Sequence, residues 1–355
     1  MDKRMKQKQI ENFFSDGSSP LVSVVMTVFN GGIYIRESIE SIINQTYSNF
    51  EFIIVNDAST DDTESIIKSF SDTRIIYIKN ELNSGIGPSR NKANKLARGK
   101  YIATLDADDI AHEERLQKQV VFMEKNANIA VCGSSFTQID TKGKKLRKIT
   151  LPVDPVAIRT ELLLWNCICN PSIMIRRDVS HANPYKKEFE LTEDFELWYR
   201  ISLNNEIHNL PEALCFYRVH EGNISTVKKE QLMEVAKKLF QIILTDLKVE
   251  FSEAELTMHR DALYFLYDKF ESPNNLENLE TWFHKLMRHI RNNDKYDFNH
   301  FYSILMNRWI TMAFNRKDYH SMLFNSFIHI APMTYVKTLF QKLGDRMAKK
   351  KMMIL

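Results

Sequence analysis

Short apolar segments alternate with helical patterns in the amino-terminal part of the chain, and this alternation limits the folds available to it. Four segments have the length and the apolar content of buried strands, namely Leu21–Phe29, Phe50–Val55, Arg74–Ile78 and Tyr101–Leu105. Helical spacing follows the first segment, where one face carries Ile35, Ile39, Ile42 and Ile43. Repeated alternation of this kind predicts an α/β fold with a mostly parallel sheet flanked by helices.

Three carboxylates, Asp106, Asp108 and Asp109, follow the fourth predicted strand. Open α/β sheets bind ligands beyond the carboxyl ends of their strands. These acids have no basic partner in the same segment, so they would repel one another unless a cation lay among them. Oxygen ligands on a loop suit a hard divalent ion that substrate phosphates also hold. The alternative interpretation is an acidic surface loop.

Polar and aromatic groups at the other strand ends suit a nucleotide. Asp57 could accept the imide N–H of a uracil-type base, and Thr27 and Phe29 could supply a hydroxyl and a ring. Arg90 could approach a diphosphate. The structural alternatives are a helix cap or turn acid for Asp57, strand packing for Thr27 and Phe29, and a solvated helix arginine for Arg90.

A dinucleotide-binding oxidoreductase is the obvious competing class of enzyme. Such a fold requires Gly-x-Gly-x-x-Gly between its first strand and first helix. The corresponding turn here is Phe29–Tyr34, which has bulky residues where phosphate would need close approach. The sequence therefore argues against that class.

Four segments together resemble the nucleotide-sugar half of family 2 glycosyltransferases, which are inverting enzymes with the Rossmann-like GT-A fold. The segments are Ser23–Asn30, Val55–Thr63, Ser89–Asn91 and Gly99–Asp109. The resemblance continues more loosely to about Ser225 and implies that four residues line the nucleotide pocket: Thr27, Phe29, Asp57 and Arg90. It places Asp106 on the ribose or metal side and assigns Asp108, in the Asp-x-Asp motif, to a divalent ion, Mn²⁺ or Mg²⁺.

Glu193 and Asp194 lie in the first turn of a predicted helix, where acids usually serve as caps. The resemblance instead assigns Asp194 as the base that takes a proton from the acceptor hydroxyl, with Glu193 as a structural or acceptor-orienting neighbour. A later segment, Tyr217–Ser225, resembles one that closes over the diphosphate. There Arg218 or His220 could stabilise the leaving group, or His220 could bind the metal; a surface loop is the alternative.

Beyond the first sheet segments, the pattern predicts strands over Ile129–Phe136 and Asn170–Arg176, with Asp154 capping a helix between them. After about Lys228 only helical patterns remain, including Leu232–Leu247 and Leu276–Ile290. Aromatic residues at helical spacing in this region are expected to be core. The amphipathic run Met322–Tyr335 suits either a membrane surface or packing on its own domain.

We therefore predict a polar lead-in over residues 1–19, a GT-A domain over residues 20–227 and a helical extension over residues 228–355. Residues 1–19 lack the apolar core of a signal peptide. The four cysteines follow no zinc or disulfide spacing and fit a reducing compartment. The basic end Lys337–Leu355 is too small for a nucleic-acid surface but would suit an anionic membrane.

The expected reaction is inverting transfer from a nucleotide-sugar, with UDP-sugar favoured, to the hydroxyl of a saccharide or lipid-linked saccharide. Such an enzyme would serve bacterial surface polysaccharide or glycolipid synthesis in the cytoplasm, peripheral to the inner face of the plasma membrane, and could form homo-oligomers. Two alternatives stay open. One is a nucleotide-sugar-binding module without turnover, and the other is a glycoside hydrolase, which would use paired carboxylates without nucleotide or metal.

Overall fold

The structure, a computed structural model, describes residues 21–223, 227–263 and 276–315. The described chain divides into two compact units. Unit 1 comprises residues 21–151, 168–197 and 204–223, and unit 2 comprises residues 152–167, 198–203, 227–263 and 276–315. We predicted a single boundary between residues 227 and 228, whereas unit 2 also takes in residues 152–167 and 198–203. The predicted basic end and the run Met322–Tyr335 lie outside the described residues.

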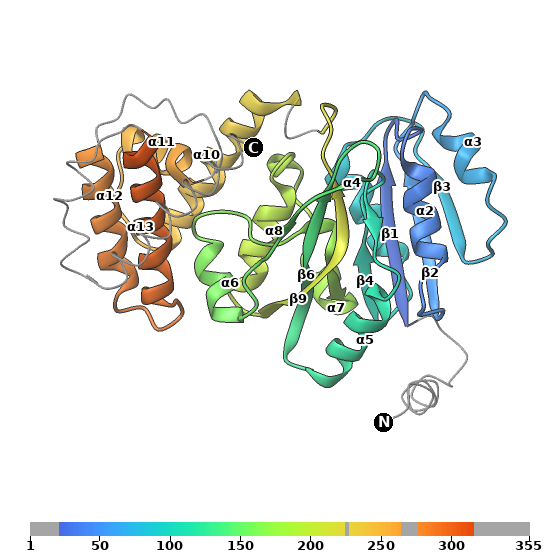
Figure 1. Ribbon diagram of the computed structural model, residues 1–355, viewed down its shortest axis with the longest axis horizontal. Helices are drawn as coiled ribbons and strands as arrows, with labels where there is room; N and C mark the ends of the chain where they lie inside the picture. The colour runs from blue at the N-terminus through green and yellow to red at the C-terminus, as the bar shows by residue number, and fades with distance from the viewer. Residues whose placement is uncertain (1–20, 224–226, 264–275, 316–355) are drawn as a thin grey trace, which may run out of the picture. The chain divides into compact units, whose positions relative to one another are not determined.

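Unit 1 is built on a nine-stranded sheet with helices beside it (Figure 1). The strands follow the order β3-β2-β1-β4-β8-β6-β9-β5, and β7 pairs with β6 outside this path. The four predicted strands are confirmed as β1 (Val22–Val28), β2 (Phe50–Asn56), β3 (Ile75–Lys79) and β4 (Tyr101–Thr104). They pair in parallel, so their carboxyl ends share one edge of the sheet.

The second half of the sheet is mixed. Its strands are β5 (Ile110–Ala111), β6 (Ile129–Ile139), β7 (Lys145–Ile149), β8 (Met174–Arg176) and β9 (Glu206–Arg218). Strand β8 is antiparallel to β4 and β6, while β6 and β9 run parallel. The predicted strand over Asn170–Arg176 is only partly correct, because Pro171 lies in the short 3-10 helix η1 (Asn170–Ser172) and proline cannot donate to a ladder.

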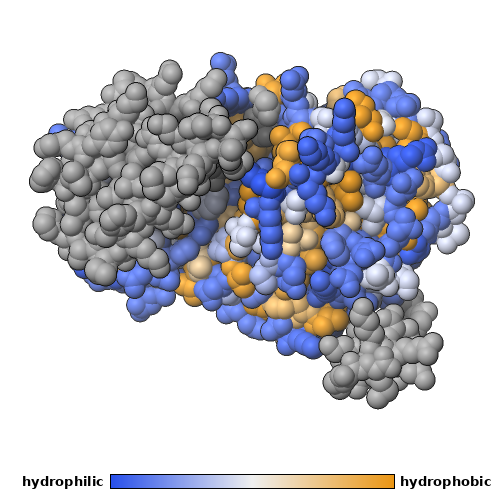
Figure 2. Space-filling view, in the orientation of Figure 1, coloured by the Kyte–Doolittle hydropathy of each residue, from blue (hydrophilic) through white to orange (hydrophobic). Residues whose placement is uncertain are grey.

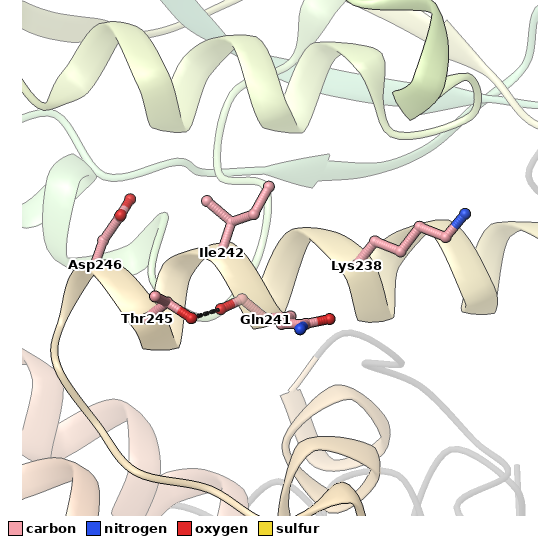
Figure 3. Close-up of a pocket in the computed structure, with 5 residues that line it drawn as sticks. All are labelled: Lys238, Gln241, Ile242, Thr245 and Asp246. Carbon is pink, nitrogen blue, oxygen red and sulfur yellow. Dashed lines mark hydrogen bonds between the residues drawn. The ribbon is translucent and has the colours of Figure 1, made fainter.

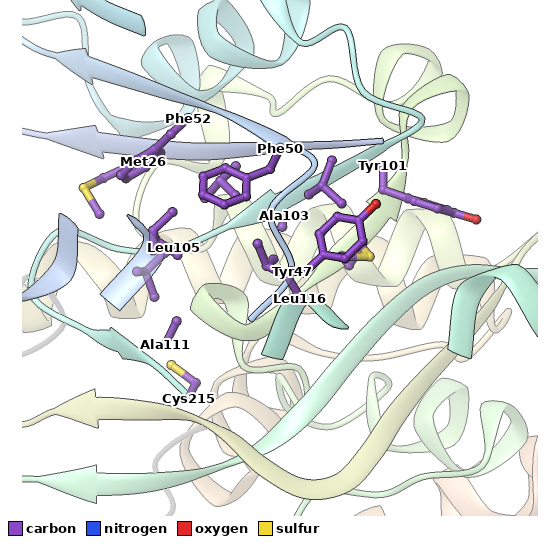
Figure 4. Close-up of a cluster of buried hydrophobic side chains, with 14 of the residues drawn as sticks. Met26, Tyr47, Phe50, Phe52, Tyr101, Ala103, Leu105, Ala111, Leu116 and Cys215 are labelled. Carbon is purple, nitrogen blue, oxygen red and sulfur yellow. The ribbon is translucent and has the colours of Figure 1, made fainter. Parts of the chain in front are cut away.

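The helices of unit 1 arise where the apolar spacing changes from two to about 3.6 residues. They are α2 (Ile35–Ile43), α3 (Thr63–Lys68), α4 (Ile86–Leu96), α5 (Arg115–Lys125), α7 (Arg177–Ala182), the 3-10 helix η2 (Lys187–Phe189) and the first half of α8 (Glu193–Ser202). Apolar side chains from both halves of the sheet meet in one core (Figure 4), where Met26 and Phe52 belong to the same cluster as Leu116 and Cys215. Fully burying such a side chain stabilises the fold by roughly 1.5–3 kcal/mol.

Arg115, at the start of α5, is fully buried and joins the two halves of the sheet. Its Nη2 donates to the carbonyl oxygens of Thr104, 2.8 Å away, and Ile173, 2.9 Å away. Burial lowers the pKa of this guanidinium. These contacts fix the end of β4 immediately before the acidic segment.

Unit 2 is helical in its described residues. It contains α6 (Pro155–Glu161), the second half of α8, α10 (Lys229–Asp246), α11 (Glu253–Leu263), α12 (Leu276–Ile290) and α13 (Phe298–Asn315). Asp154 caps α6 as predicted, since its Oδ1 accepts from the N–H groups of Val156 and Ala157. Trp282 and Phe283 are core residues, also as predicted. All four tryptophans belong to unit 2.

None of the described helices is long and apolar enough to cross a membrane.

Gly99 provides a test of the packing between the α4–β4 turn and β1. A Cβ atom at this position would lie 2.5 Å from the backbone nitrogen of Ser23, which cannot move without disturbing the sheet. We expect Gly99→Ala to lower the free energy of unfolding by about 1–3 kcal/mol, measured by urea denaturation with far-ultraviolet circular dichroism. Gly87→Ala is the control, because its added Cβ would make an ordinary 3.4 Å contact with Tyr185. Equal midpoints for the two variants would contradict this account.

Candidate active site

Polar and aromatic residues gather at the carboxyl edge of the parallel strands. Phe29, directly after β1, is 51% exposed, and Thr27 is half-buried on the same strand. The neighbouring strands β2 and β4 lead into Asp57 and Asp106. The loop after β1 is tied to the loop after β2, where Asn30 Oδ1 accepts from the N–H of Thr60 at 2.8 Å. The fold therefore brings the predicted nucleotide residues to one edge.

Asp57 is buried and organises the loop that leads into α4. Its Oδ1 accepts from Asn80 Nδ2 at 2.6 Å and from Ser84 Oγ at 2.9 Å, and its Oδ2 accepts from the N–H of Gly85 at 2.9 Å. Burial alone would raise the pKa of Asp57, but these hydrogen bonds hold it below its ordinary value. Gly85 suits this turn because its φ is +92°. As the structural alternative predicts, Asp57 holds the turn between β3 and α4.

Arg90 connects two acidic segments that lie far apart in the sequence. Its Nη2 is 2.8 Å from Asp106 Oδ1, and its Nη1 is 2.9 Å from Glu193 Oε1. The guanidinium is 7% exposed and lies over the ring of Tyr185 at 5.5 Å. Arg90 is therefore a buried bridge between the acidic turn after β4 and the start of α8, and not a solvated helix arginine.

Asp194 follows this bridge in the first turn of α8 and is partly exposed. Its Oδ1 accepts from the N–H of Phe195 at 2.7 Å. Burial, and then the charge of Glu193, raise the pKa of Asp194 to about 7, although Arg90 opposes the shift. A carboxylate with this pKa can accept and release a proton near neutral pH.

The acidic turn after β4 holds three carboxylates in different surroundings. Asp108 is 33% exposed, and its Oδ2 lies 3.0 Å from His220 Nε2. Burial and the charge of Asp106 raise the pKa of Asp108, while the hydrogen bond to His220 lowers it. Asp109 is buried, accepts from the N–H of Arg218 at 2.8 Å, and has its pKa raised well above the ordinary value by burial.

Arg218, at the end of β9, has a side chain that is only 1% exposed. Its Nε donates to the carbonyl of Asp108 at 2.9 Å, and its Nη2 contacts Glu37 Oε2 at 2.6 Å. The ring of Tyr34 lies 4.5 Å from the guanidinium. In this arrangement Arg218 holds the acidic turn in place, so the direct contact with a diphosphate that we predicted from the sequence would require this side chain to leave its partners.

Asp108 and His220 offer a carboxylate oxygen and an imidazole nitrogen as candidate metal ligands. Among the described residues, no three His, Cys, Asp or Glu side chains gather closely enough to hold an ion by themselves. A divalent ion in a phosphotransfer or nucleotide site commonly takes one or two protein ligands and completes its shell with phosphates and water. The Asp108 carboxylate and the His220 imidazole are 3.0 Å apart and both partly exposed, so they fit a site in which phosphates and water complete the shell of the ion.

The sequence did not reveal several residues that hold the site. Asn80 and Ser84 contact Asp57, and Glu37 contacts Arg218 from helix α2. Asn80 directly follows β3, so its place at a strand end was a usable signal. The sequence carried no such signal for Glu37, because an acid on an amphipathic helix is usually solvated.

The described part of the chain has a further concavity outside this site to compare with it. On the face in Figure 2, apolar residues of the described chain lie in small groups among hydrophilic ones. A concavity in unit 2 is lined by Lys238, Gln241, Ile242, Thr245 and Asp246 (Figure 3). All five belong to α10 and include a single carboxylate. This surface lacks the paired acids and the arginine of the site in unit 1.

Comparison with known proteins decides the family. The sequence profile of glycosyl transferase family 2 matches residues 23–182. A glycosyltransferase of Haemophilus influenzae is 38% identical over 232 residues, which cover 62% of this chain and 72% of that protein. This chain belongs to the family 2 glycosyltransferases.

A second relative and a solved structure extend the comparison. UDP-Glc:alpha-D-GlcNAc-diphosphoundecaprenol beta-1,3-glucosyltransferase WfaP of Escherichia coli is 33% identical to this glycosyltransferase over 62% of this chain and 86% of WfaP. The crystal structure of S. aureus TarS 1-349 in complex with UDP-GlcNAc aligns with a TM-score of 0.55 and 20% identity, over 90% of this chain and 89% of that one. The predicted GT-A fold is therefore confirmed.

The Arg90 bridge can be tested by a double-mutant cycle. Removing one partner of a buried ion pair leaves the other uncompensated, so we expect Arg90→Gln to lower the free energy of unfolding by about 3 kcal/mol. Arg90→Gln combined with Glu193→Gln should cost less than the sum of the two single changes. Urea denaturation measures all three, and Lys95→Gln, at an exposed position of α4, is the control. Strict additivity would mean that the two side chains are not coupled.

Proposed function

We propose that this glycosyltransferase transfers a sugar from a nucleotide-sugar, with UDP-sugar favoured, to an acceptor hydroxyl with inversion at the anomeric carbon. The observation that carries the proposal is the Arg90 bridge between Asp106 and Glu193. It couples the acidic turn to the helix that carries Asp194, whose pKa of about 7 suits a general base. An inverting displacement needs one such base near the donor.

In this proposal the donor nucleotide lies at the carboxyl edge of β1 and β2. Phe29 offers an exposed ring for the base, and Thr27 offers a hydroxyl. Asp57 supplies an acceptor for an imide N–H and also holds the Asn80–Gly85 loop. Because its oxygens already accept several hydrogen bonds, the base would share them or replace one of them.

Asp108 and His220 would hold a divalent ion, Mn²⁺ or Mg²⁺, at the acidic turn. When bound, such an ion neutralises charge on a diphosphate leaving group. Asp106 keeps its contact with Arg90 and lies on the ribose or metal side. We assign Arg218 a positioning role, because its guanidinium fixes the backbone of Asp108 and does not reach solvent.

Asp194 would remove the proton of the acceptor hydroxyl as the oxygen attacks the anomeric carbon. Glu193 has a different role, since its Oε1 is committed to Arg90. Glu193 keeps the pKa of its neighbour high through its charge. It therefore tunes and positions the base without accepting the proton itself.

The acceptor is proposed to be a saccharide on a lipid diphosphate. WfaP, which is 33% identical, acts on a diphosphoundecaprenol-linked sugar according to its name. Such an acceptor would place the enzyme in bacterial surface glycan synthesis, at the cytoplasmic face of the membrane. Homo-oligomer formation stays a prediction. A nucleotide-sugar-binding module is the alternative, and turnover separates the two.

The first test measures UDP release from a panel of UDP-sugars in Mn²⁺ or in EDTA. We expect metal-dependent release with one sugar, and a loss of about 10²–10⁴-fold in rate for Asp194→Asn with donor binding retained. Asp108→Asn should weaken donor binding in Mn²⁺ to the level seen in EDTA. Glu188→Gln, at an exposed position of unit 1, is the control. Turnover that is indifferent to Asp194→Asn would refute the assignment of the base.

The pH dependence provides a separate test. The base acts only when deprotonated, so kcat should rise with pH through an inflection near 7 and level off above it. Glu193→Gln removes a charge that raises this pKa, so the inflection should move to lower pH. The measurement is kcat at saturating donor and acceptor across neutral pH. A profile that stays flat would show that Asp194 does not titrate in the reaction.

A further inference from the structure

The β6–β7 hairpin carries a run of basic residues that the proposed reaction does not use. Between Lys142 and Lys148 the sequence is Lys-Gly-Lys-Lys-Leu-Arg-Lys, with five basic residues and no acid. Every residue from 141 to 148 is exposed. The hairpin belongs entirely to unit 1, and among the described strands β7 pairs only with β6. A dense positive charge is therefore presented on an open strand.

The turn of this hairpin is held in one conformation. Asp140 Oδ1 accepts from the N–H groups of Lys142 and Lys144, each at 2.9 Å, and the N–H of Asp140 donates to the carbonyl of Lys144 at 3.0 Å. Gly143 has a φ of +78°, which the tight turn requires. The Asp140 carboxylate is thus occupied by backbone groups, and the exposed residues Lys142 and Lys144 lie on a turn that these hydrogen bonds hold.

An exposed leucine lies within the basic run. In the ladder Arg147 faces Gln138 and Lys145 faces Ile139, so Leu146 falls at an irregularity and faces no residue. Its side chain is 54% exposed. Apolar groups flanked by lysine and arginine suit the interfacial zone of a bilayer, where the charges meet lipid phosphates and the apolar group enters the headgroup region. A nucleic acid would use the charges but not the leucine.

The hairpin is connected to the active site through Arg218. Nη1 of Arg218 donates to the carbonyl oxygens of Asp140 at 3.2 Å and Thr141 at 3.3 Å. Nε of the same guanidinium holds the carbonyl of Asp108. One buried side chain therefore fixes the base of the hairpin against the acidic turn.

We propose that the β6–β7 hairpin, residues Asp140–Ile149, docks this enzyme on an anionic phospholipid bilayer. The docking follows from the charge and the leucine alone. Its value for catalysis rests on the proposed lipid-linked acceptor, whose diphosphate would lie at the bilayer surface beside the donor site. The competing explanation is that basic residues on an edge strand only prevent strand pairing between molecules.

The test is sedimentation of the full chain with vesicles of equal parts phosphatidylglycerol and phosphatidylcholine, and with phosphatidylcholine alone, without substrates. We expect binding to the anionic vesicles only, weakened by salt. Each basic residue near such a surface contributes about five-fold in affinity, so the triple variant Lys142→Gln, Lys144→Gln and Lys148→Gln should bind roughly 100-fold more weakly. Leu146→Ser should also weaken binding.

The matched control removes the same charge elsewhere in unit 1, at exposed positions Lys95→Gln, Lys125→Gln and Lys187→Gln. Equal loss in both triple variants would overturn the proposal in favour of a general charge effect. Wild-type binding by the hairpin variant, or no binding by the wild type, would overturn it as well. Asp194→Asn should bind vesicles normally, so failure of the proposed reaction and failure of docking are measured separately.

Discussion

The guanidinium of Arg90 lies between two carboxylates, that of Asp106 after β4 and that of Glu193 at the start of α8. Glu193 is 103 positions beyond Arg90 in the chain. Glu193 could not be buried at this place without it, because an unpaired charge in a desolvated setting is costly. The pairing thereby fixes the start of α8 against the end of the parallel sheet. Arg90 thereby ties the acidic turn to α8, the helix that carries Asp194.

Two other buried side chains, those of Asp57 and Arg218, also hold loops of the site in place. Asp57 holds the loop between β3 and α4 through its hydrogen bonds, and Arg218 holds the acidic turn from the opposite half of the sheet. Each is satisfied largely by backbone groups, so the loops are set before any ligand arrives. Preorganised polar groups of this kind cost no rearrangement at the moment of reaction.

Much of the first half of the fold could be predicted because its strands are continuous apolar runs. Strand β9 could not, since Glu206–Arg218 contains Pro211 and Glu212 and shows no clear alternation. Site residues could likewise be predicted where they lie close to the end of such a strand. Asp57 directly follows β2, and Asp106 and Asp108 lie in the turn after β4, so position alone marked them as candidates.

The roles of the site residues were harder to predict than their positions. Arg90 was expected to meet a diphosphate, yet it bridges two acids, because its partner Glu193 comes from a distant segment that no local pattern connects to it. Arg218 was expected near the leaving group, but the contact with Glu37 of α2 buries it. Long-range ion pairs depend on how the sheet and helices pack, and sequence spacing carries no record of that.

The confinement of all four tryptophans to unit 2 has a spectroscopic consequence. Indole emission reports on unit 2 alone, whereas unit 1 contributes tyrosine and phenylalanine but no indole. Dichroism of the peptide bonds reports on both units together. Unfolding curves from the two signals coincide only where the units unfold as one cooperative body. An unmodified sample therefore already carries a probe that distinguishes the stability of one unit from that of the whole.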